Sequence, residues 1–410
     1  MDILFLSQYF HPEQFLNNHI ARELVEQGHG VNVVCCVPNY PAGRFADGYS
    51  NFKRKRENWH GVNIHRVFTI PRGRSAIQLV ANYLTYPIAA SWRISRLGRK
   101  RGEISFVSMP SPLFQAIAGI FAKKLWRIPS VYWVQDIWPD SAIITLGIRN
   151  RLVVATLNAV CGWIYRQADL VMVQSDGFHP KIAEFGVAPD KIVTLPNSAS
   201  AMFRPLTAAE IPAEIRSLIP PDRRVIMFAG NIGESQDFDT IIDGAKLLGD
   251  DNSMLFVIVG SGRDEDRVRQ RVKSEGLDER FLFLGRHPEA AMPALFACAD
   301  AMLVSLRDEQ IFRLTIPSKV QAYMACGKPI LASLAGQGAA VVAGAGAGLT
   351  SLPGDKQSFC KMIQAMSEMS DADLTKMGAN ARHAYVEQFA LDAVLAKLIA
   401  HCENILSQRG

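Results

Sequence analysis

The run of residues 317–331, Pro-Ser-Lys-Val-Gln-Ala-Tyr-Met-Ala-Cys-Gly-Lys-Pro-Ile-Leu, could bind an anion at the start of a predicted helix. Pro317 suits the first helical position, where the following backbone N–H groups have no intrahelical partner. The first turn then carries Ser318 and Lys319, and the lysine adds a full charge to the positive end of the helix dipole. The pattern therefore predicts a phosphate-binding site. The alternative is an ordinary helix with a surface lysine.

The elements that would position this motif alternate between short apolar runs and helical stretches. Gly327 is expected to end the helix, and the Gly/Ala-rich run 336–348 is expected to be a loop. The carboxyl ends of parallel strands collect ligands, so two such sheets facing one another would form a cleft. Predicted strands are 3–6, 31–37, 104–108, 131–134, 170–173 and 192–195, then 224–229, 255–259, 281–284 and 329–332; predicted helices include 17–27, 113–126 and 151–167.

The length of 410 residues exceeds one ordinary core and suggests two domains of similar size. The boundary is expected at the Pro-Asn-Ser sequence 196–198. The stretch 198–222 has four prolines and no clear strand, which is typical of a linker.

Seven scattered cysteines, without a Cys-x-x-Cys pair, argue against a disulfide framework and against a structural zinc site. Nine dispersed histidines show no metal-ligand spacing, so we expect neither a metal nor another cofactor. The first residues form a strand-like run without a secretory signal. A cytoplasmic protein is expected.

Residues 53–101 are strongly basic, with twelve Lys or Arg and a single acid, Glu57. Within them, 76–98 is apolar and aromatic but interrupted by Asn82 and Pro87, so a membrane span is not expected. One interpretation is a segment lying in the interface of an anionic membrane, on the inner face of the plasma membrane. The other is a core-packing helix with a solvated basic end. Nucleic acid is not an expected partner, because no recognised binding module accompanies the charge.

The order of several short motifs resembles the family-4 type of retaining glycosyltransferases. These motifs are Tyr9-Phe10-His11-Pro12-Glu13, Pro38-Asn39-Tyr40-Pro41, Gln135-Asp136-Ile137-Trp138-Pro139-Asp140, Leu195-Pro196-Asn197 and Ala325-Cys326-Gly327-Lys328-Pro329. With Pro-Ser-Lys, they are similar to the subgroup that builds bacterial O-antigens and capsules. Members of that subgroup commonly move an amino or deoxyamino sugar to a lipid-linked diphosphate acceptor.

This resemblance implies an α/β fold of two facing Rossmann-like domains, called GT-B. It implies an acceptor-side domain over 1–197, the linker 198–222, a nucleotide-sugar domain over 223–388, and a C-terminal helix, 389–410, that returns to the first domain. The implied partners are a UDP-sugar donor and a lipid-linked diphosphate saccharide.

Several family positions are occupied by unexpected residues. The usual Glu-x7-Glu pair falls on Leu314 and Ala322, whose side chains cannot accept a hydrogen bond from a sugar. The Arg and Lys that commonly hold the donor diphosphate are replaced by Asn231 and Gln236, on either side of Gly233. The paired glycines expected after Pro-Glu are Phe15 and Leu16.

Positive charge for the departing nucleotide diphosphate can still come from Lys319, Arg313 and Arg307, in or just before the predicted anion site. Arg286 follows a strand end where the family often holds the nucleotide base. The donor site therefore groups Lys319, Ser318, Arg313, Asn231, Gln236, Arg286 and Gly233.

On the acceptor side, Asp136 and Glu13 are the predicted catalytic carboxylates, because both follow strands of the first domain. The alternative for Asp136 is a loop or helix-capping hydrogen bond. His11 and Asn18 are predicted to contact the acceptor. The leading function is a glycosyltransferase; an epimerase acting on UDP-N-acetylhexosamine and an inactive scaffold in a polysaccharide assembly complex remain alternatives.

Overall fold

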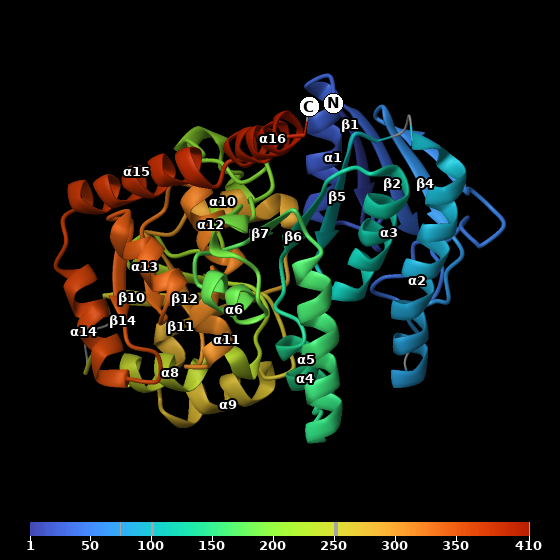
Figure 1. Ribbon diagram of the computed structural model, residues 1–410. Coiled ribbons are helices and arrows are strands. Elements are labelled where there is room, and N and C mark those ends of the chain that lie inside the picture. Colours follow the sequence, from blue (N-terminus) through green and yellow to red (C-terminus); the bar gives the residue numbers. More distant parts are fainter. Residues whose placement is uncertain (74, 100–101, 250–252, 410) are drawn as a thin grey trace. The chain divides into compact units, whose positions relative to one another are not determined.

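The computed structural model describes residues 1–73, 75–99, 102–249 and 253–409 (Figure 1). Arg74, Lys100 and Arg101 of the basic segment lie outside the described residues. The chain forms two compact units, and the first joins Met1–Pro196 to Val394–Gly410. The second comprises Asn197–Ala393, so the predicted linker folds with it.

The first unit is built on an eight-stranded sheet in the order β3-β4-β2-β1-β5-β6-β7-β8. All neighbouring strands are parallel except the β3–β4 hairpin. The strands are β1 (Asp2–Leu6), β2 (Gly30–Cys36), β3 (Arg56–Trp59), β4 (Val62–Val67), β5 (Ile104–Met109), β6 (Ser130–Val134), β7 (Leu170–Val173) and β8 (Ile192–Thr194). The helices are α1 (Leu16–Glu26), α2 (Ala76–Leu97), α3 (Ala116–Trp126), α4 (Asp140–Leu146), α5 (Arg151–Arg166), α6 (Phe178–Glu184) and α16 (Leu391–Ser407), with short 3-10 turns η2 (Leu113–Gln115) and η3 (Pro189–Lys191).

The second unit is built on a six-stranded parallel sheet in the order β11-β10-β9-β12-β13-β14. Its strands are β9 (Arg224–Ala229), β10 (Met254–Val259), β11 (Phe281–Gly285), β12 (Ala301–Ser305), β13 (Ile330–Ser333) and β14 (Gly348–Ser351). Its helices are α7 (Ala213–Arg216), α8 (Phe238–Lys246), α9 (Glu265–Ser274), α10 (Met292–Ala297), α11 (Gln310–Leu314), α12 (Ser318–Ala325), α13 (Gln337–Gly344), α14 (Lys356–Ser367) and α15 (Asp371–Gln388), with 3-10 turns η4 (Ala208–Glu210), η5 (Glu234–Gln236), η6 (Asp278–Arg280) and η7 (Glu289–Ala291).

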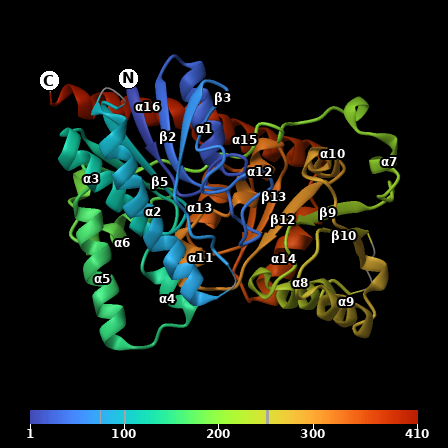
Figure 2. The same cartoon turned by 90° about the vertical axis from the view of Figure 1, so that its right-hand side faces the viewer.

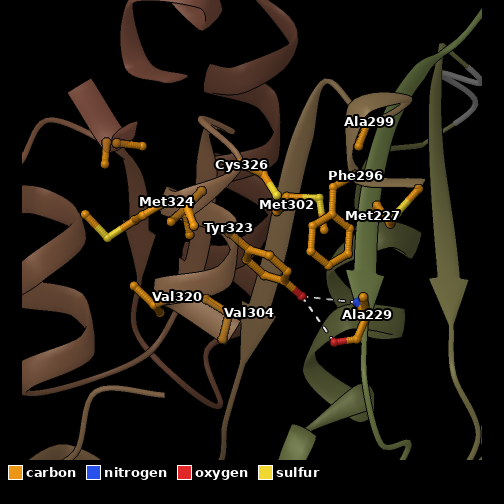
Figure 3. Close-up of a cluster of buried hydrophobic side chains, with 14 of the residues drawn as sticks. Met227, Ala229, Phe296, Ala299, Met302, Val304, Val320, Tyr323, Met324 and Cys326 are labelled. Carbon is orange, nitrogen blue, oxygen red and sulfur yellow. Dashed lines mark hydrogen bonds between the residues drawn. The ribbon is translucent and has the colours of Figure 1, made fainter. Parts of the chain in front are cut away.

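Both sheets are Rossmann-like, which confirms the predicted α/β fold class. The central strands are buried on both faces because helices cover both sides of a parallel sheet, and their sequences are therefore almost continuously apolar. In the second unit, one cluster packs Met227, Met302 and Val304 against Tyr323 and Met324 of α12 (Figure 3). This packing fixes α12, which carries the predicted anion site, to the sheet.

The structure also differs from the sequence expectations, because strands β3, β4, β12 and β14 were not among the predicted strands. The run 336–348 was expected to be a loop, but most of it forms α13, which follows Gly336 (φ 72°) and packs against β13 and β14. The β3–β4 hairpin turns at His60 and Gly61, whose φ values of 46° and 83° suit the tight turn that joins such strands.

The C-terminal part of α16 belongs to the first unit, where Arg409 forms an ion pair of 2.7 Å with Asp169 of that unit. Within the described ranges, none of the helices combines the length and the apolar character needed to cross a membrane.

Candidate functional site

Lys319 lies at the start of α12, beside the loop that follows β9. Its Nζ is 3.8 Å from the centroid of the Phe228 ring and donates a hydrogen bond to Oε1 of Gln236. No Asp or Glu among the described residues forms an ion pair with it. Burial lowers the pKa of Lys319 to about 7. A cation without an anionic partner, held against apolar surface, is poised to bind an anion.

The glycines of the neighbouring loops allow this close approach. A Cβ on Gly230, which has a φ of 145°, would lie 2.5 Å from Cε of Lys319. A Cβ on Gly260 would lie 1.9 Å from the carbonyl oxygen of Gly230. At Gly260 the added atom would meet backbone, and at Gly230 it would displace the Lys319 side chain; both positions also have a positive φ, which favours glycine. The loops after β9 and β10 are joined further by the hydrogen bond of 3.0 Å from the Ile232 amide to the Ser261 carbonyl.

Tyr323, one turn after Lys319, holds α12 to the end of β9 (Figure 3). Its hydroxyl donates to the Ala229 carbonyl and accepts from the Ala229 amide, both at 3.2 Å. Ala229 directly precedes residues 230–233, the loop after β9 that we call the glycine loop. The buried Tyr323 therefore fixes the glycine loop and Lys319 relative to each other.

The predicted donor residues are only partly brought together. Asn231 folds over Gly233, because a Cβ on Gly233 would lie 2.7 Å from the Asn231 Nδ2 atom. These two residues share the β9 loop with Gln236, the partner of Lys319. Ser318 is exposed at the first position of α12.

The two predicted arginines have partners of their own. Arg313 is engaged by Asp308 through hydrogen bonds of 2.6 and 2.5 Å, and this pairing lowers the pKa of Asp308. The charge of Arg313 is therefore already balanced locally. Arg286 is exposed and donates to the hydroxyl of Ser261, which places it at the loop after β10, next to the glycine loop.

In the first unit, Glu13 is buried and accepts hydrogen bonds from three backbone amides. The donors are Phe10 at 3.2 Å, Asn39 at 2.7 Å and Tyr40 at 2.6 Å. Burial raises the pKa of Glu13 to about 7, although these amides act in the opposite direction. The carboxylate thus ties the loop after β1 to the loop after β2.

His11 and Asn18 complete this loop structure. The Asn18 side chain accepts from the His11 amide at 3.0 Å and donates to the Glu13 carbonyl at 2.6 Å. The His11 ring stacks on Trp59, with centroids 4.6 Å apart, and burial lowers its pKa. Arg66 donates to the His11 carbonyl at 2.7 Å. These contacts hold the shape of the loop after β1.

Asp136 lines a pocket at the carboxyl end of the first sheet. The pocket measures about 260 Å³, just under the roughly 300–1,000 Å³ of drug-sized ligand sites. Burial raises the pKa of Asp136 to about 6, while the Ser141 hydroxyl and the Ile137 amide act to lower it. Asp136 therefore offers a half-buried carboxylate to whatever occupies the pocket.

Aromatic residues form much of the pocket wall, although none of them was predicted as a site residue. Phe15 stands where a glycine was expected, and its ring stacks on Tyr9 with centroids 5.7 Å apart. Tyr40 packs against both rings, and Arg72 lies over the Tyr40 ring at 5.4 Å. The lining residues are Tyr9, Phe15, Tyr40, Arg72, Leu79, Tyr83, Pro110, Ser111, Asp136, Trp138, Ser141 and Ala142.

Sequence models of two glycosyltransferase families match this chain. The "Glycosyl transferase 4-like domain" matches residues 17–198, and "Glycosyl transferases group 1" matches residues 212–384. Together with the two Rossmann-like sheets, these matches define the class of protein: the chain is a glycosyltransferase with a GT-B fold of the family-4 type.

Among curated proteins, the chain is 26% identical to the putative colanic acid biosynthesis glycosyl transferase WcaI of Escherichia coli K12, over 80% of this chain and 82% of that protein. It is 25% identical to the probable glycosyltransferase WbjE of Pseudomonas aeruginosa, over 68% and 69% of the two chains. Among solved structures, Anabaena HepE in complex with UDP and glucose matches with a TM-score of 0.67 at 19% identity, over 98% and 99% of the two chains.

Proposed function

We propose that the protein transfers a sugar from a UDP-sugar to a lipid-linked saccharide during the synthesis of a bacterial O-antigen, capsule or exopolysaccharide. The single observation that carries the proposal is Lys319, which lies beside the loop after β9 and pairs with no carboxylate in the described part of the chain. A nucleotide diphosphate would supply the missing negative charge. The HepE structures, solved with UDP or UDP-glucose, support this type of donor.

In the proposed reaction, a bond forms between the acceptor oxygen and the anomeric carbon while the bond from that carbon to the diphosphate breaks. The acceptor proton passes to the leaving phosphate on the same face of the sugar, which retains the anomeric configuration. Lys319 and the N-terminal amides of α12 stabilise the charge that builds on the diphosphate. No metal is needed in this scheme because these groups supply the positive partners.

The first unit would bind the acceptor in its aromatic pocket. The rings of Tyr9, Phe15 and Tyr40 offer apolar surfaces to a sugar, and the Asp136 carboxylate would orient the reacting hydroxyl. An N-acetylated amino or deoxyamino sugar is the proposed donor sugar, on the strength of the Pro-Ser-Lys and Pro-Asn-Tyr-Pro motifs. The proposed location is the cytoplasmic face of the plasma membrane.

The test is mass-resolved transfer from a panel of UDP-sugars, including UDP-N-acetylhexosamines, to lipid-linked diphosphate acceptors. We expect a product whose mass rises by one sugar, and loss of that product with Lys319→Met. Lys361→Met, at an exposed position of α14, is the matched control and should retain transfer. Conversion of the donor without any acceptor would instead establish an epimerase, and no turnover of any donor would contradict the transferase.

A further inference from the structure

The outward face of α2 is apolar, although nothing in the described chain covers it. Ile77, Val80, Leu84, Ile88 and Trp92 follow one another at spacings of three or four residues, so they form one stripe along the helix. Ile77 is 82% exposed, Ile88 73% and Trp92 61%. The opposite face, with Tyr83, Tyr86 and Ile94, is buried in the unit.

A helix with apolar residues on both faces is usually buried on both faces. Figures 1 and 2 show α2 along the outside of the first unit, with its first turns extending beyond the strands. The outward stripe is therefore a candidate interaction surface that the rest of the described chain leaves uncovered.

A basic and aromatic pocket adjoins the second half of this stripe. Its lining joins Trp92, Arg93 and Ala89 of α2 to residues from the loop before β3 and from the end of β4. The lining residues are Asn51, Phe52, Lys55, Arg56, Arg66, Val67, Phe68, Ala89, Trp92 and Arg93, and no acid is among them.

The cations of this pocket crowd one another. The pKa of Arg93 is lowered by burial and then by the nearby charges of Arg56 and Arg96. Arg66 is paired with Glu57, the single acid of the segment 53–101, which leaves the other described cations there without that partner. Their mutual repulsion would be relieved by an anionic group such as a phosphate.

Exposed aromatic residues stand beside these cations. Phe52 is 84% exposed and lies 5.4 Å from the Lys55 ammonium, while Arg96 stacks over the Trp92 ring at 3.7 Å. Aromatic rings flanked by Lys and Arg are typical of surfaces that lie at the level of lipid headgroups.

We infer that α2, with Phe52, Phe68 and the cations Lys53 to Arg56, is a docking surface for an anionic lipid bilayer. In this arrangement α2 lies in the membrane interface with its apolar stripe facing the acyl chains, and the pocket holds a lipid phosphate. The inference deepens the proposed function, on which it rests for the presence of a lipid-linked acceptor in the same bilayer.

Charge favours a bilayer over a second copy of the chain. A dimer formed through this face would bring two sets of the same cations together, and the segment 53–101 of each copy holds a single acid, Glu57, which is already paired with Arg66. Anionic headgroups supply the opposite charge over an extended area.

The experiment is flotation of the purified protein with vesicles of phosphatidylglycerol and phosphatidylethanolamine, compared with vesicles of phosphatidylcholine alone. We expect binding to the anionic vesicles, at least tenfold weaker binding to the neutral ones, and weakening by added salt. The double variant Ile88→Gln, Trp92→Ser should bind anionic vesicles roughly tenfold or more weakly. Leu352→Gln, at a position 64% exposed in the second unit, is the matched control and should bind as the wild type does.

The charge is tested by Lys55→Glu, which should weaken anionic binding roughly 30-fold, because the reversal changes the charge by two. Lys361→Glu makes the same change at an exposed position of α14 and should have little effect. Equal binding to both vesicle types, or binding that these variants leave unchanged, would overturn the inference. So would a wild-type dimer that the double variant converts to monomers.

Transfer to a short, water-soluble acceptor separates this inference from the proposed function. The docking variants should retain that activity while they lose vesicle binding. Absence of transfer by any form of the protein would count against the proposed function, and the flotation result would still decide the docking surface.

Discussion

The pH dependence of donor binding tests the role of Lys319 most directly. Burial against Phe228 brings the pKa of Lys319 to about 7, and only the protonated amine attracts a diphosphate. Donor affinity should therefore be highest below pH 7 and should fall as the pH rises through it. A UDP-sugar is the suitable ligand because its diphosphate does not titrate in this range.

The magnitude follows from the protonated fraction. With a pKa of about 7, that fraction falls from about nine-tenths at pH 6 to about one-tenth at pH 8. The affinity should fall about tenfold over this interval. A hydrogen bond to a charged group contributes about 1.5–3 kcal/mol, so Lys319→Met should lower the affinity at pH 6 by roughly 10- to 150-fold.

The assay is isothermal titration calorimetry with UDP-glucose and UDP-N-acetylglucosamine between pH 6 and pH 8. Repeating each titration in buffers of different ionisation enthalpy measures the protons taken up on binding. We expect uptake that grows from pH 6 to pH 8, because a larger fraction of Lys319 must be protonated. Lys319→Arg keeps its charge at every pH used and should flatten the profile.

An unchanged affinity in Lys319→Met would refute the assignment of the diphosphate to this lysine. A wild-type profile that does not change with pH, or that persists in Lys319→Arg, would refute the link between burial and protonation. Lys361→Met is the control for a general loss of positive charge, and it should bind as the wild type does.

Three further predictions concern other residues. The pKa of Asp136 is raised to about 6, so transfer that needs its carboxylate should decline as the pH falls through 6, and Asp136→Asn should lower kcat roughly 100-fold or more in a transfer assay. Glu13→Gln replaces a carboxylate oxygen that accepts backbone amides, so urea unfolding should show a loss of about 1–3 kcal/mol, against no change for the exposed Glu214→Gln. Gly230→Ala forces a Cβ against Lys319 and should weaken UDP-glucose binding in calorimetry, whereas Gly276→Ala, which has a positive φ but open space, should leave it unchanged.

Most of the fold could be predicted from the sequence because its strands are buried on both faces. Such strands are continuous apolar runs, and the predicted 224–229 and 170–173 coincide with β9 and β7. The run 336–348 was predicted wrongly as a loop. Glycine and alanine leave no apolar pattern there, and packing of α13 on the sheet decides the outcome.

The candidate site was less predictable because its contacts join residues far apart in the chain. Lys319 was predicted from the Pro-Ser-Lys motif, and Gln236 from its place at a position where the family commonly has a cation. No local signal in the sequence indicated that these two side chains would form a hydrogen bond or that the Phe228 ring would lie under the ammonium. Arg313 and Asp308, by contrast, are only five residues apart, and their pairing depends on how α11 directs Arg313 back toward a residue that precedes the helix.

The sequence also could not decide whether residues 76–98 form a membrane-interface helix or a core-packing helix, because that depends on contacts with distant parts of the chain. Periodicity shows that apolar residues surround α2, but not which face the rest of the unit covers. The structure buries Tyr86 and exposes Ile88, so the helix has a core-packing face and an unoccupied apolar face.

The two hydrogen bonds between Tyr323 and Ala229 have a consequence for turnover. Because they fix the glycine loop and Lys319 together before any ligand arrives, little chain ordering has to accompany donor binding. A preformed site of this kind contacts the diphosphate of a spent nucleotide as well as that of a fresh donor. In the proposed reaction, UDP would therefore compete with its own precursor, and the rate of sugar addition in the cell would depend on how quickly UDP is removed.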